Sequence, residues 1–200
     1  MLDLNSIMEH LEKTISSKRY IHSVNVSKTA KKLAEFYEYD AVKAEIAGLV
    51  HDCARDLEKP LQLKCLKEEG IEADELILNI GELLHGPAAV HICRKVFAID
   101  DKEILSAVRY HTTGKENMSL LEKIIYLSDF IEPARNFPGV AELRGLAFKN
   151  LDKALLLAFN SSILYILSKN EYVHINTILA RNHVLKEVGE NGMQYHDSSR

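Results

Sequence analysis

Apolar residues recur at spacings of three and four along nearly the whole chain, and alternating, strand-like runs are hard to find. This spacing puts apolar side chains on one face of a helix, so it predicts an all-α protein. The sequence has no internal repeat, low-complexity segment or linker-like run, which favours one domain, a single bundle of about ten helices. The predicted helices cover residues 3–15, 19–37, 41–55, 60–70, 74–80, 87–97, 101–110, 120–131, 140–149, 152–169 and 175–188.

Capping residues mark several of the predicted helix boundaries. Asp40 is suited to cap the third helix, and Asp100 or Asp101 the seventh, because a carboxylate can accept hydrogen bonds from the first free backbone N–H groups. Ser119 followed by Glu122 forms the capping-box pattern in front of an apolar run. These residues predict where the polar loops end and the helices begin.

Pro87 and Gly189 indicate two further boundaries. Proline has no N–H to lose in a first helical turn, so we expect a helix to begin at Pro87. Glycine favours the position just after a helix, so we expect the last helix to end before Gly189. Residues 190–200 carry no apolar stripe and are expected to form a mobile tail. The domain is therefore expected to span residues 1–189, with its core in 18–170.

Composition and charge narrow the class of protein. The 200 residues are 46% hydrophobic and 27% charged, as in soluble globular proteins, and a formal net charge of −4 argues against a nucleic-acid-binding surface. The longest uncharged run, residues 154–168, has 15 residues and falls short of the roughly 18 apolar residues of a membrane span. The N-terminus does not resemble a signal peptide, and the three cysteines form no CxxC pair. The sequence therefore predicts a cytoplasmic protein with reduced thiols.

Residues of the metal-binding types fall in several separate stretches of the chain. Imidazoles and carboxylates bind zinc, iron and manganese, and they could hold here one ion or a close pair. A close pair of ions suits the cleavage of phosphate esters or anhydrides. The His51-Asp52 dipeptide alone is also compatible with a hydrogen-bonded helix end. The candidate ligands are His22, His51, Asp52, His85, His111 and Asp129.

The sequence around the two aspartates favours metal binding over an ordinary structural role. Asp129 stands in a nearly all-apolar segment, and His51 and Asp52 follow the apolar run of residues 47–50. Burial of a charged group is costly unless that group is paired or bound to a metal. We expect Asp52 to be the catalytic residue, because it could bind or bridge metal with one oxygen and orient the attacking water with the other.

A second group of residues could bind the phosphates and the base of a nucleotide. Guanidinium groups match phosphate oxygens in a fork, although each arginine is equally compatible with an ordinary surface charge. Hydroxyls and free backbone N–H groups after His111 could also bind phosphate, and an aromatic ring in a rigid turn could pack on a base. The candidates are Arg19, Arg109, Arg135, Thr112, Thr113, Gly114 and Phe137.

The order of these motifs resembles one known family. His22, then His51-Asp52, then Asp129 is similar to the H…HD…D signature of the HD-domain metal-dependent phosphohydrolases. The resemblance is closest to the YqeK-type HD hydrolases, described as symmetrical bis(5′-nucleosyl)-tetraphosphatases, and runs from about residue 19 to residue 182. It rests on the segments RYIHSV (19–24), AGLVHD (47–52), LLHGP (83–87), RYHTTG (109–114), KIIYLSD (123–129) and IEPARNFPGV (131–140).

The resemblance implies a fold, a cofactor and a reaction. The fold is an all-α HD-domain bundle, and the cofactor is a pair of divalent ions on the six candidate ligands, with iron as the first choice and manganese, cobalt or zinc as alternatives. The reaction is the symmetrical cleavage of diadenosine tetraphosphate and related dinucleoside polyphosphates into two nucleoside diphosphates. A metal-bound hydroxide would attack a phosphoanhydride.

Two other functions stay open from the sequence. One is a different HD-type nucleotide phosphohydrolase, such as a nucleoside monophosphate phosphatase or a deoxynucleotide triphosphohydrolase. The other is a non-catalytic nucleotide-binding protein in which metal is a structural staple, although six ligands exceed the four of a closed structural site. The expected partner is a small dinucleoside polyphosphate rather than a nucleic acid or a membrane, and the apolar final helices could pair in a homodimer.

Overall fold

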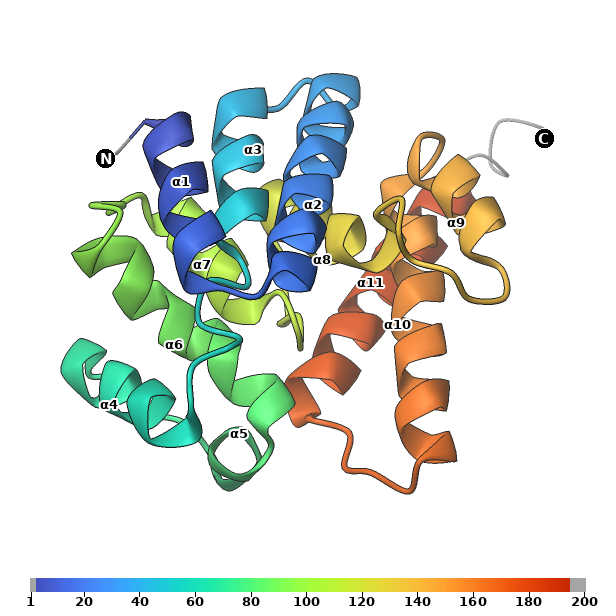
Figure 1. The fold of residues 1–200 in the computed structure, drawn as a ribbon. Coiled ribbons are helices and arrows are strands. Elements are labelled where there is room, and N and C mark those ends of the chain that lie inside the picture. Colours follow the sequence, from blue (N-terminus) through green and yellow to red (C-terminus); the bar gives the residue numbers. More distant parts are fainter. Residues whose placement is uncertain (1–2, 195–200) are drawn as a thin grey trace.

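Eleven α-helices and no β-strand make up residues 3–194, the part of the chain that the computed structural model describes; side chains are described to residue 189 (Figure 1). The all-α prediction is therefore confirmed. The helices are α1 (Leu4–Thr14), α2 (Ser17–Phe36), α3 (Ala41–Val50), α4 (Lys59–Glu69), α5 (Glu75–Asn79), α6 (Gly81–Lys95), α7 (Lys102–Tyr110), α8 (Leu120–Ile131), α9 (Val140–Ala147), α10 (Leu151–Ser168) and α11 (Ile175–Gln194).

The predicted caps are confirmed. Asp40 accepts from the backbone N–H of Lys43 at 2.9 Å, and Asp101, rather than Asp100, caps α7. Ser119 and Glu122 form a complete capping box at the start of α8. These contacts satisfy backbone donors that have no partner inside the helix, which is why the sequence located these boundaries well.

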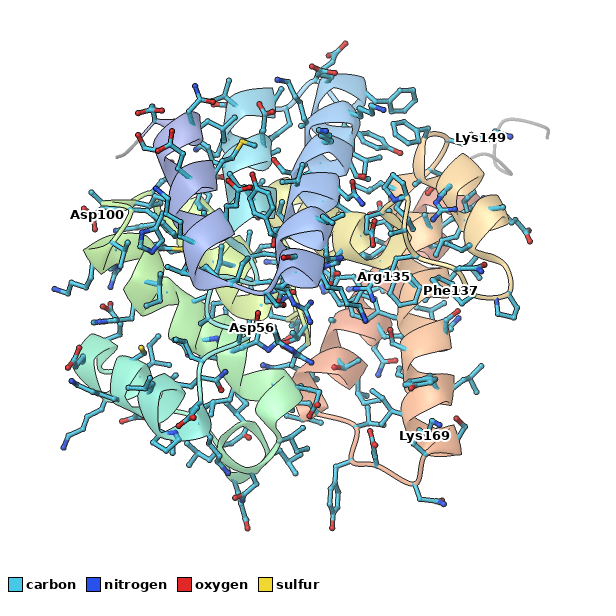
Figure 2. All side chains as sticks on the ribbon, viewed as in Figure 1. Asp56, Asp100, Arg135, Phe137, Lys149 and Lys169 are labelled. Carbon is cyan, nitrogen blue, oxygen red and sulfur yellow. The ribbon has the colours of Figure 1, made fainter. Side chains whose placement is uncertain are left out.

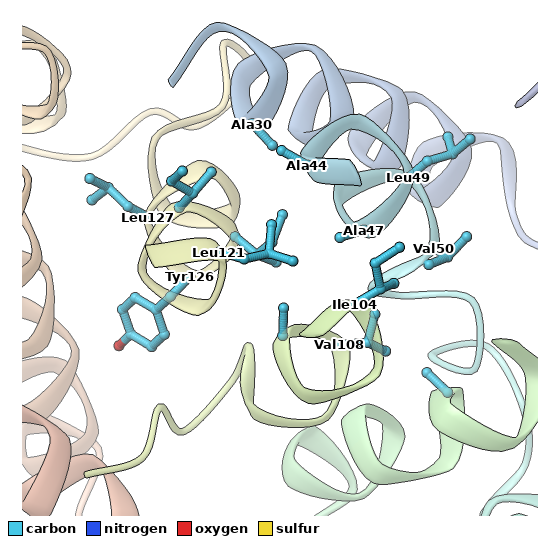
Figure 3. Close-up of a cluster of buried hydrophobic side chains, with 14 of the residues drawn as sticks. Ala30, Ala44, Ala47, Leu49, Val50, Ile104, Val108, Leu121, Tyr126 and Leu127 are labelled. Carbon is cyan, nitrogen blue, oxygen red and sulfur yellow. The ribbon is translucent and has the colours of Figure 1, made fainter. Parts of the chain in front are cut away.

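The core lies where α3, α7 and α8 meet under α2. Leu49, Ile104, Val108 and Leu121 are buried there (Figure 3). Helix α3 lies very close to α2, because a Cβ added to Gly48 would be 2.9 Å from the Cα of Ser27. This close packing holds the N-terminal half of α2 next to the C-terminal end of α3, where two of the predicted metal ligands begin.

A second close approach joins α6 to α7. A Cβ added to Gly86 would lie 2.8 Å from the backbone oxygen of Arg109, so only glycine fits at this crossing without a shift. The two helices bring His85 and His111 to the same point, with 2.9 Å between their Nε2 atoms. The packing of helices that are distant in sequence therefore builds the site.

The start of α6 differs from the prediction. The helix begins at Gly81, so Pro87 lies inside it and His85 stands within the helix rather than at its entrance. A proline in a second turn removes one backbone donor. The burial of Leu84, Gly86 and Ala88 against neighbouring helices offsets that loss.

The end of α3 also differs from the prediction. The α-helix stops at Val50, and residues 51–56 form turns instead of continuing the helix to Arg55. Backbone bonds from Cys53 to Val50 and from Arg55 to Asp52 join residues three apart, which is a tighter winding than an α-helix. This winding turns the side chains of His51 and Asp52 inward, where both are buried.

The last helix is longer than predicted. Helix α11 continues to Gln194, so Gly189 lies inside it and residues 190–194 are helical, whereas the tail was expected to begin at residue 190. Residues 195–200 of that expected tail lie outside the described residues.

Helix α10 is the one helix, within the described chain, that is long and apolar enough to cross a membrane by length and composition alone. Its inward face, with Leu155, Ala158 and Phe159, is fully buried, and the helix packs against α8, α9 and α11. These contacts bury one face of α10, while Leu157, Leu164 and Leu167 of the same helix are exposed. All three cysteines are buried and free, which confirms the prediction of unpaired thiols.

Candidate metal centre

The six candidate ligands lie together at the centre of the bundle, although they come from five different helices or helix ends. His22 is on α2, His85 on α6 and Asp129 on α8, while His51, Asp52 and His111 follow the last turns of α3 and α7. The structure thus brings together residues that are separated by more than a hundred positions in the sequence.

Asp52 is the hub of the cluster, with a side chain that is only 5% exposed. Its Oδ1 lies 2.9 Å from Nε2 of His85 and 3.5 Å from Nε2 of His111. Its Oδ2 lies 3.4 Å from Nε2 of His51 and 3.7 Å from Nε2 of His22. Each oxygen of this one carboxylate therefore faces two imidazoles, so Asp52 would be shared between two ions if each pair of imidazoles held one.

Three of the histidines have their tautomer fixed by an acceptor behind the ring. Nδ1 of His51 donates to the backbone oxygen of Gly48 at 2.7 Å, and Nδ1 of His111 donates to that of Val108 at 2.7 Å. Nδ1 of His22 donates to the carboxylate of Glu132 at 3.2 Å. When these rings are neutral, each carries its one proton on Nδ1, and Nε2 then offers a lone pair to the cluster.

The lone pairs make the cluster fit a cation. Nε2 of His22 and Nε2 of His51 are buried and have no hydrogen-bond partner. Nε2 of His22 lies 3.0 Å from Oδ1 of Asp129, and in the neutral ring both atoms are acceptors. Donor atoms of His22, His51 and Asp129, and likewise of His51, Asp52 and His111, all lie within 4.8 Å of one another. Buried acceptors at such distances are stabilised by a positive charge between them.

The pKa shifts of Asp52, Asp129 and His85 are also those expected of a cation-binding cluster. Burial raises the pKa of Asp52, but its histidine neighbours, His51 first, lower it by more, so the pKa is well below its usual range. Burial also raises the pKa of Asp129, but His22, His51 and Arg135 together lower it by more. Burial lowers the pKa of His85 to about 4. At neutral pH the carboxylates are ionised and His85 is neutral, the state that binds a divalent cation.

Arg19 and Arg135, two predicted phosphate ligands, lie at the centre. Arg19 pairs with Oδ2 of Asp52 and Arg135 with Oδ1 of Asp129, each at 2.5 Å. Both arginines line a cavity of about 570 Å³, which also reaches His22. Arg135 and Phe137 extend from the loop that follows α8 (Figure 2), and the Phe137 ring packs edge-on against Phe130. This cavity therefore borders the cluster at His22.

The phosphate-binding candidates around the end of α7, namely Arg109, Thr112 and Thr113, line other cavities. Arg109 lies over the ring of Tyr110 and lines a different cavity of about 650 Å³. With Thr112 and Thr113 it also lines a cavity of about 130 Å³. None of the six candidate ligands lines either cavity, whereas His22 lines the cavity of Arg19 and Arg135.

The structure contradicts the prediction that Gly114 offers a free backbone N–H to phosphate. Its backbone N–H donates to the oxygen of Tyr110 at 2.8 Å and is not free to bind phosphate. Its φ is +65°, and an added Cβ would be 2.7 Å from the ring of Phe159. Glycine is needed here for the turn and for the packing of α10.

Three further side chains lie around the centre, of which sequence reasoning missed Arg55 and Arg144. Glu132 is buried and accepts from His22, from Asn25 at 3.1 Å and from the backbone N–H of Ala134 at 2.6 Å. Arg144, on α9, donates to the backbone oxygens of residues 131, 132, 133 and 135. Arg55 donates to Nδ1 of His85 at 2.9 Å. The HD dipeptide three residues earlier signals Arg55, but nothing in the sequence pattern signals Arg144.

Comparison with known proteins finds relatives that have an HD domain. A model of the HD domain family matches residues 19–134. A protein of Halalkalibacterium halodurans named "Bis(5′-nucleosyl)-tetraphosphatase, symmetrical" is 38% identical and covers 86% of this chain and 92% of its own length. A Bacillus subtilis protein of the same name is 39% identical with the same coverage. A crystal structure from Clostridium acetobutylicum, described as a predicted HD superfamily hydrolase involved in NAD metabolism, matches with a TM-score of 0.90 at 44% identity, over 94% of this chain and 99% of that one.

Proposed function

The chain belongs to the HD domain family, and from that premise we propose that it is a metal-dependent hydrolase of dinucleoside polyphosphates. Its substrate is diadenosine tetraphosphate, and its products are two molecules of ADP. The observation that carries the proposal is the Asp52-centred cluster, open to a cavity with two arginines, in a chain whose relatives bear the name symmetrical bis(5′-nucleosyl)-tetraphosphatase.

We propose His22, His51, Asp52 and Asp129 as the ligands of one divalent ion, and Asp52, His85 and His111 as ligands of a second. The ions supply Lewis acidity and lower the pKa of water toward neutrality. Imidazole and carboxylate ligands suit iron, which we propose first, and also manganese, cobalt and zinc.

The side chains of the chain itself bind and orient the substrate. Arg19 and Arg135 present guanidinium forks to the cavity, and each now neutralises one aspartate. When cations take over that neutralisation, both forks are free to bind phosphate oxygens. Asp52 is the catalytic residue, because its carboxylate alone contacts both halves of the cluster and can orient a water beside the phosphate.

The symmetrical cut requires one ADP end to fill the cavity. Hydrolysis joins the oxygen of one water to a central phosphorus and breaks the bond from that phosphorus to the bridging oxygen. The cavity of about 570 Å³ is large enough to hold a nucleotide end, and Ile21, 57% exposed at its wall, offers apolar surface to a base. Phe137 is the second candidate for contact with the base.

The remaining expectations belong to the same proposal. A negatively charged chain that acts on a small nucleotide fits a cytoplasmic enzyme without nucleic-acid or membrane partners. A homodimer through the exposed apolar residues of α10 and α11, such as Leu164 and Ile175, is proposed as well.

Substitution of Asp52 tests the catalytic assignment. In Asp52→Ala, the metal-loaded protein should lose more than about 100-fold in turnover of diadenosine tetraphosphate, since loss of a residue behind a ligand alone costs up to that factor. Far-UV circular dichroism should remain helical. Asp100→Ala is the control, because Asp100 is an 86% exposed carboxylate far from the centre (Figure 2). Turnover of Asp52→Ala at the wild-type rate would overturn the assignment and favour a purely structural metal.

A further inference from the structure

His85 differs from the other three histidines of the centre in what stands behind its ring. Nδ1 of His51, His111 and His22 each meets an acceptor, whereas Nδ1 of His85 meets Nη1 of Arg55 at 2.9 Å. A guanidinium group has five N–H donors and no acceptor. Nδ1 of His85 must therefore offer its lone pair to Arg55.

This contact fixes the proton of His85 on the wrong nitrogen for metal binding. If Nδ1 accepts, the single proton of the neutral ring is on Nε2, which lies 2.9 Å from Oδ1 of Asp52 and can donate to it. Metal ligation through Nε2 requires the lone pair on that atom and the proton on Nδ1. The Nδ1–H would then face an N–H of Arg55 at hydrogen-bond distance, with two donors and no acceptor.

A backbone oxygen next to His85 offers the alternative partner. His51 and His111 both donate from Nδ1 to the carbonyl three residues earlier, that of Gly48 and that of Val108. The carbonyl three residues before His85 is that of Glu82, and Arg55 Nη1 occupies it at 3.3 Å. Departure of Arg55 would free this carbonyl. Nδ1 of His85 could then donate to it, as Nδ1 of His51 and of His111 donate to theirs.

We propose that Arg55 is a phosphate-binding residue that is held on His85 and the Glu82 carbonyl until metal binds, and that then turns to the substrate. This inference rests on the proposed function for the identity of the substrate. It adds a binding site on the side of the cluster away from Arg19 and Arg135.

The surroundings of Arg55 suit that role. Its side chain is 27% exposed, so it can reach solvent. In the described part of the chain, its one carboxylate neighbour is that of Glu82, 4.0 Å away and 73% exposed, which is a weak pair in water. Once it leaves His85, the guanidinium has no strong protein partner, and a phosphate is the chemistry that its fork fits best.

The position of Arg55 matches the shape of the substrate. Arg19 stands on the Oδ2 side of Asp52, whereas His85 and with it Arg55 stand on the Oδ1 side. A substrate with a nucleotide at each end of four phosphates presents charge on both sides of the scissile bond. Arg55 would hold the half that leaves, while Arg19 and Arg135 hold the half in the cavity.

Two measurements on Arg55→Met test the proposal. The first is the dissociation constant for Mn²⁺, by chelator competition without nucleotide, where the variant should bind up to about tenfold more tightly because a competing charged hydrogen bond is gone. The second is KM for diadenosine tetraphosphate at saturating Mn²⁺, which should rise about 10- to 100-fold. Arg55→Lys keeps the charge without the fork and should show an intermediate KM.

Arg94→Met is the matched control, because it removes an arginine that pairs with Glu69 away from the centre. It should leave both quantities unchanged. If Arg55→Met binds Mn²⁺ no more tightly than wild type, Arg55 does not compete with metal; if its KM is unchanged, it does not bind phosphate. Failure of the wild type to hydrolyse diadenosine tetraphosphate would reject the proposed function instead, and the Mn²⁺ measurement would still decide the competition.

Discussion

Glu132→Gln should weaken metal binding without touching a metal ligand. Glu132 is 2% exposed and accepts three hydrogen bonds, from Nδ1 of His22, from the Asn25 amide and from the backbone N–H of Ala134. A glutamine of the same shape has only one oxygen. If that oxygen keeps Asn25 and Ala134, the NH₂ group faces His22, and the ring must then accept on Nδ1.

The magnitude follows from the tautomer. With Nδ1 accepting, the proton of His22 moves to Nε2, the atom that faces Asp129 at 3.0 Å, and Nε2 is lost as a ligand until the amide turns. Loss of such a partner behind a ligand typically costs 10- to 100-fold in metal affinity, or about 1.4–2.7 kcal/mol. The assay is chelator competition with Mn²⁺, together with urea unfolding of the metal-free protein.

Glu122→Gln is the matched control. Glu122, in the first turn of α8, is also a glutamate that is 2% exposed, and it accepts from Ser119, Ser106 and Lys115 rather than from a ligand. Both variants should unfold at lower urea concentration, but only Glu132→Gln should bind Mn²⁺ more weakly. Equal affinity of Glu132→Gln and wild type, within a factor of two, would refute the reasoning that Glu132 sets the His22 tautomer.

Three further changes test other parts of the structure. Arg144→Met removes the bonds that hold the loop carrying Arg135 and should raise KM for diadenosine tetraphosphate about tenfold; an unchanged KM would contradict this. Gly114→Ala should cost about 2–4 kcal/mol in urea unfolding, because its φ is +65° and its Cβ would meet Phe159 at 2.7 Å; a cost below 1 kcal/mol would refute it. Asp101→Ala should cost about 1 kcal/mol at pH 7. Burial raises the pKa of Asp101 but Lys43 and the α7 N–H groups lower it by more, so this difference should persist above pH 3.8 and shrink as pH falls below it; a constant difference would contradict that sign.

The helices were predictable because their signals are local. Apolar spacing and caps such as Asp40 and Ser119 act within a few residues, and the structure confirms them. The start of α6 and the end of α11 were not predictable in this way. Pro87 and Gly189 act locally as boundary signals, but packing of the surrounding residues overrides Pro87, and Gly189 is tolerated within α11.

In the site, too, the residue types were predictable from the sequence, but the directions of some side chains were not. The metal-binding residue types and their order along the chain predicted the six residues that lie together around Asp52. A buried carboxylate or imidazole needs a partner, and this need points to a cluster. The direction of a side chain at a helix end depends on packing that is distant in sequence. Arg109 therefore points to another cavity although it is two residues from His111, while Arg144 contacts the loop of Arg135 from a separate helix.

The products released from diadenosine tetraphosphate distinguish a symmetrical from an asymmetrical cut. Purified, metal-loaded protein is incubated with the substrate, and the early products are separated by ion-exchange chromatography. We expect ADP as the sole early product, because the proposed binding mode puts one ADP end in the cavity and the central anhydride at Asp52. AMP with ATP in equal amounts would contradict the symmetrical cut, and no turnover with iron, manganese or cobalt would contradict the substrate itself.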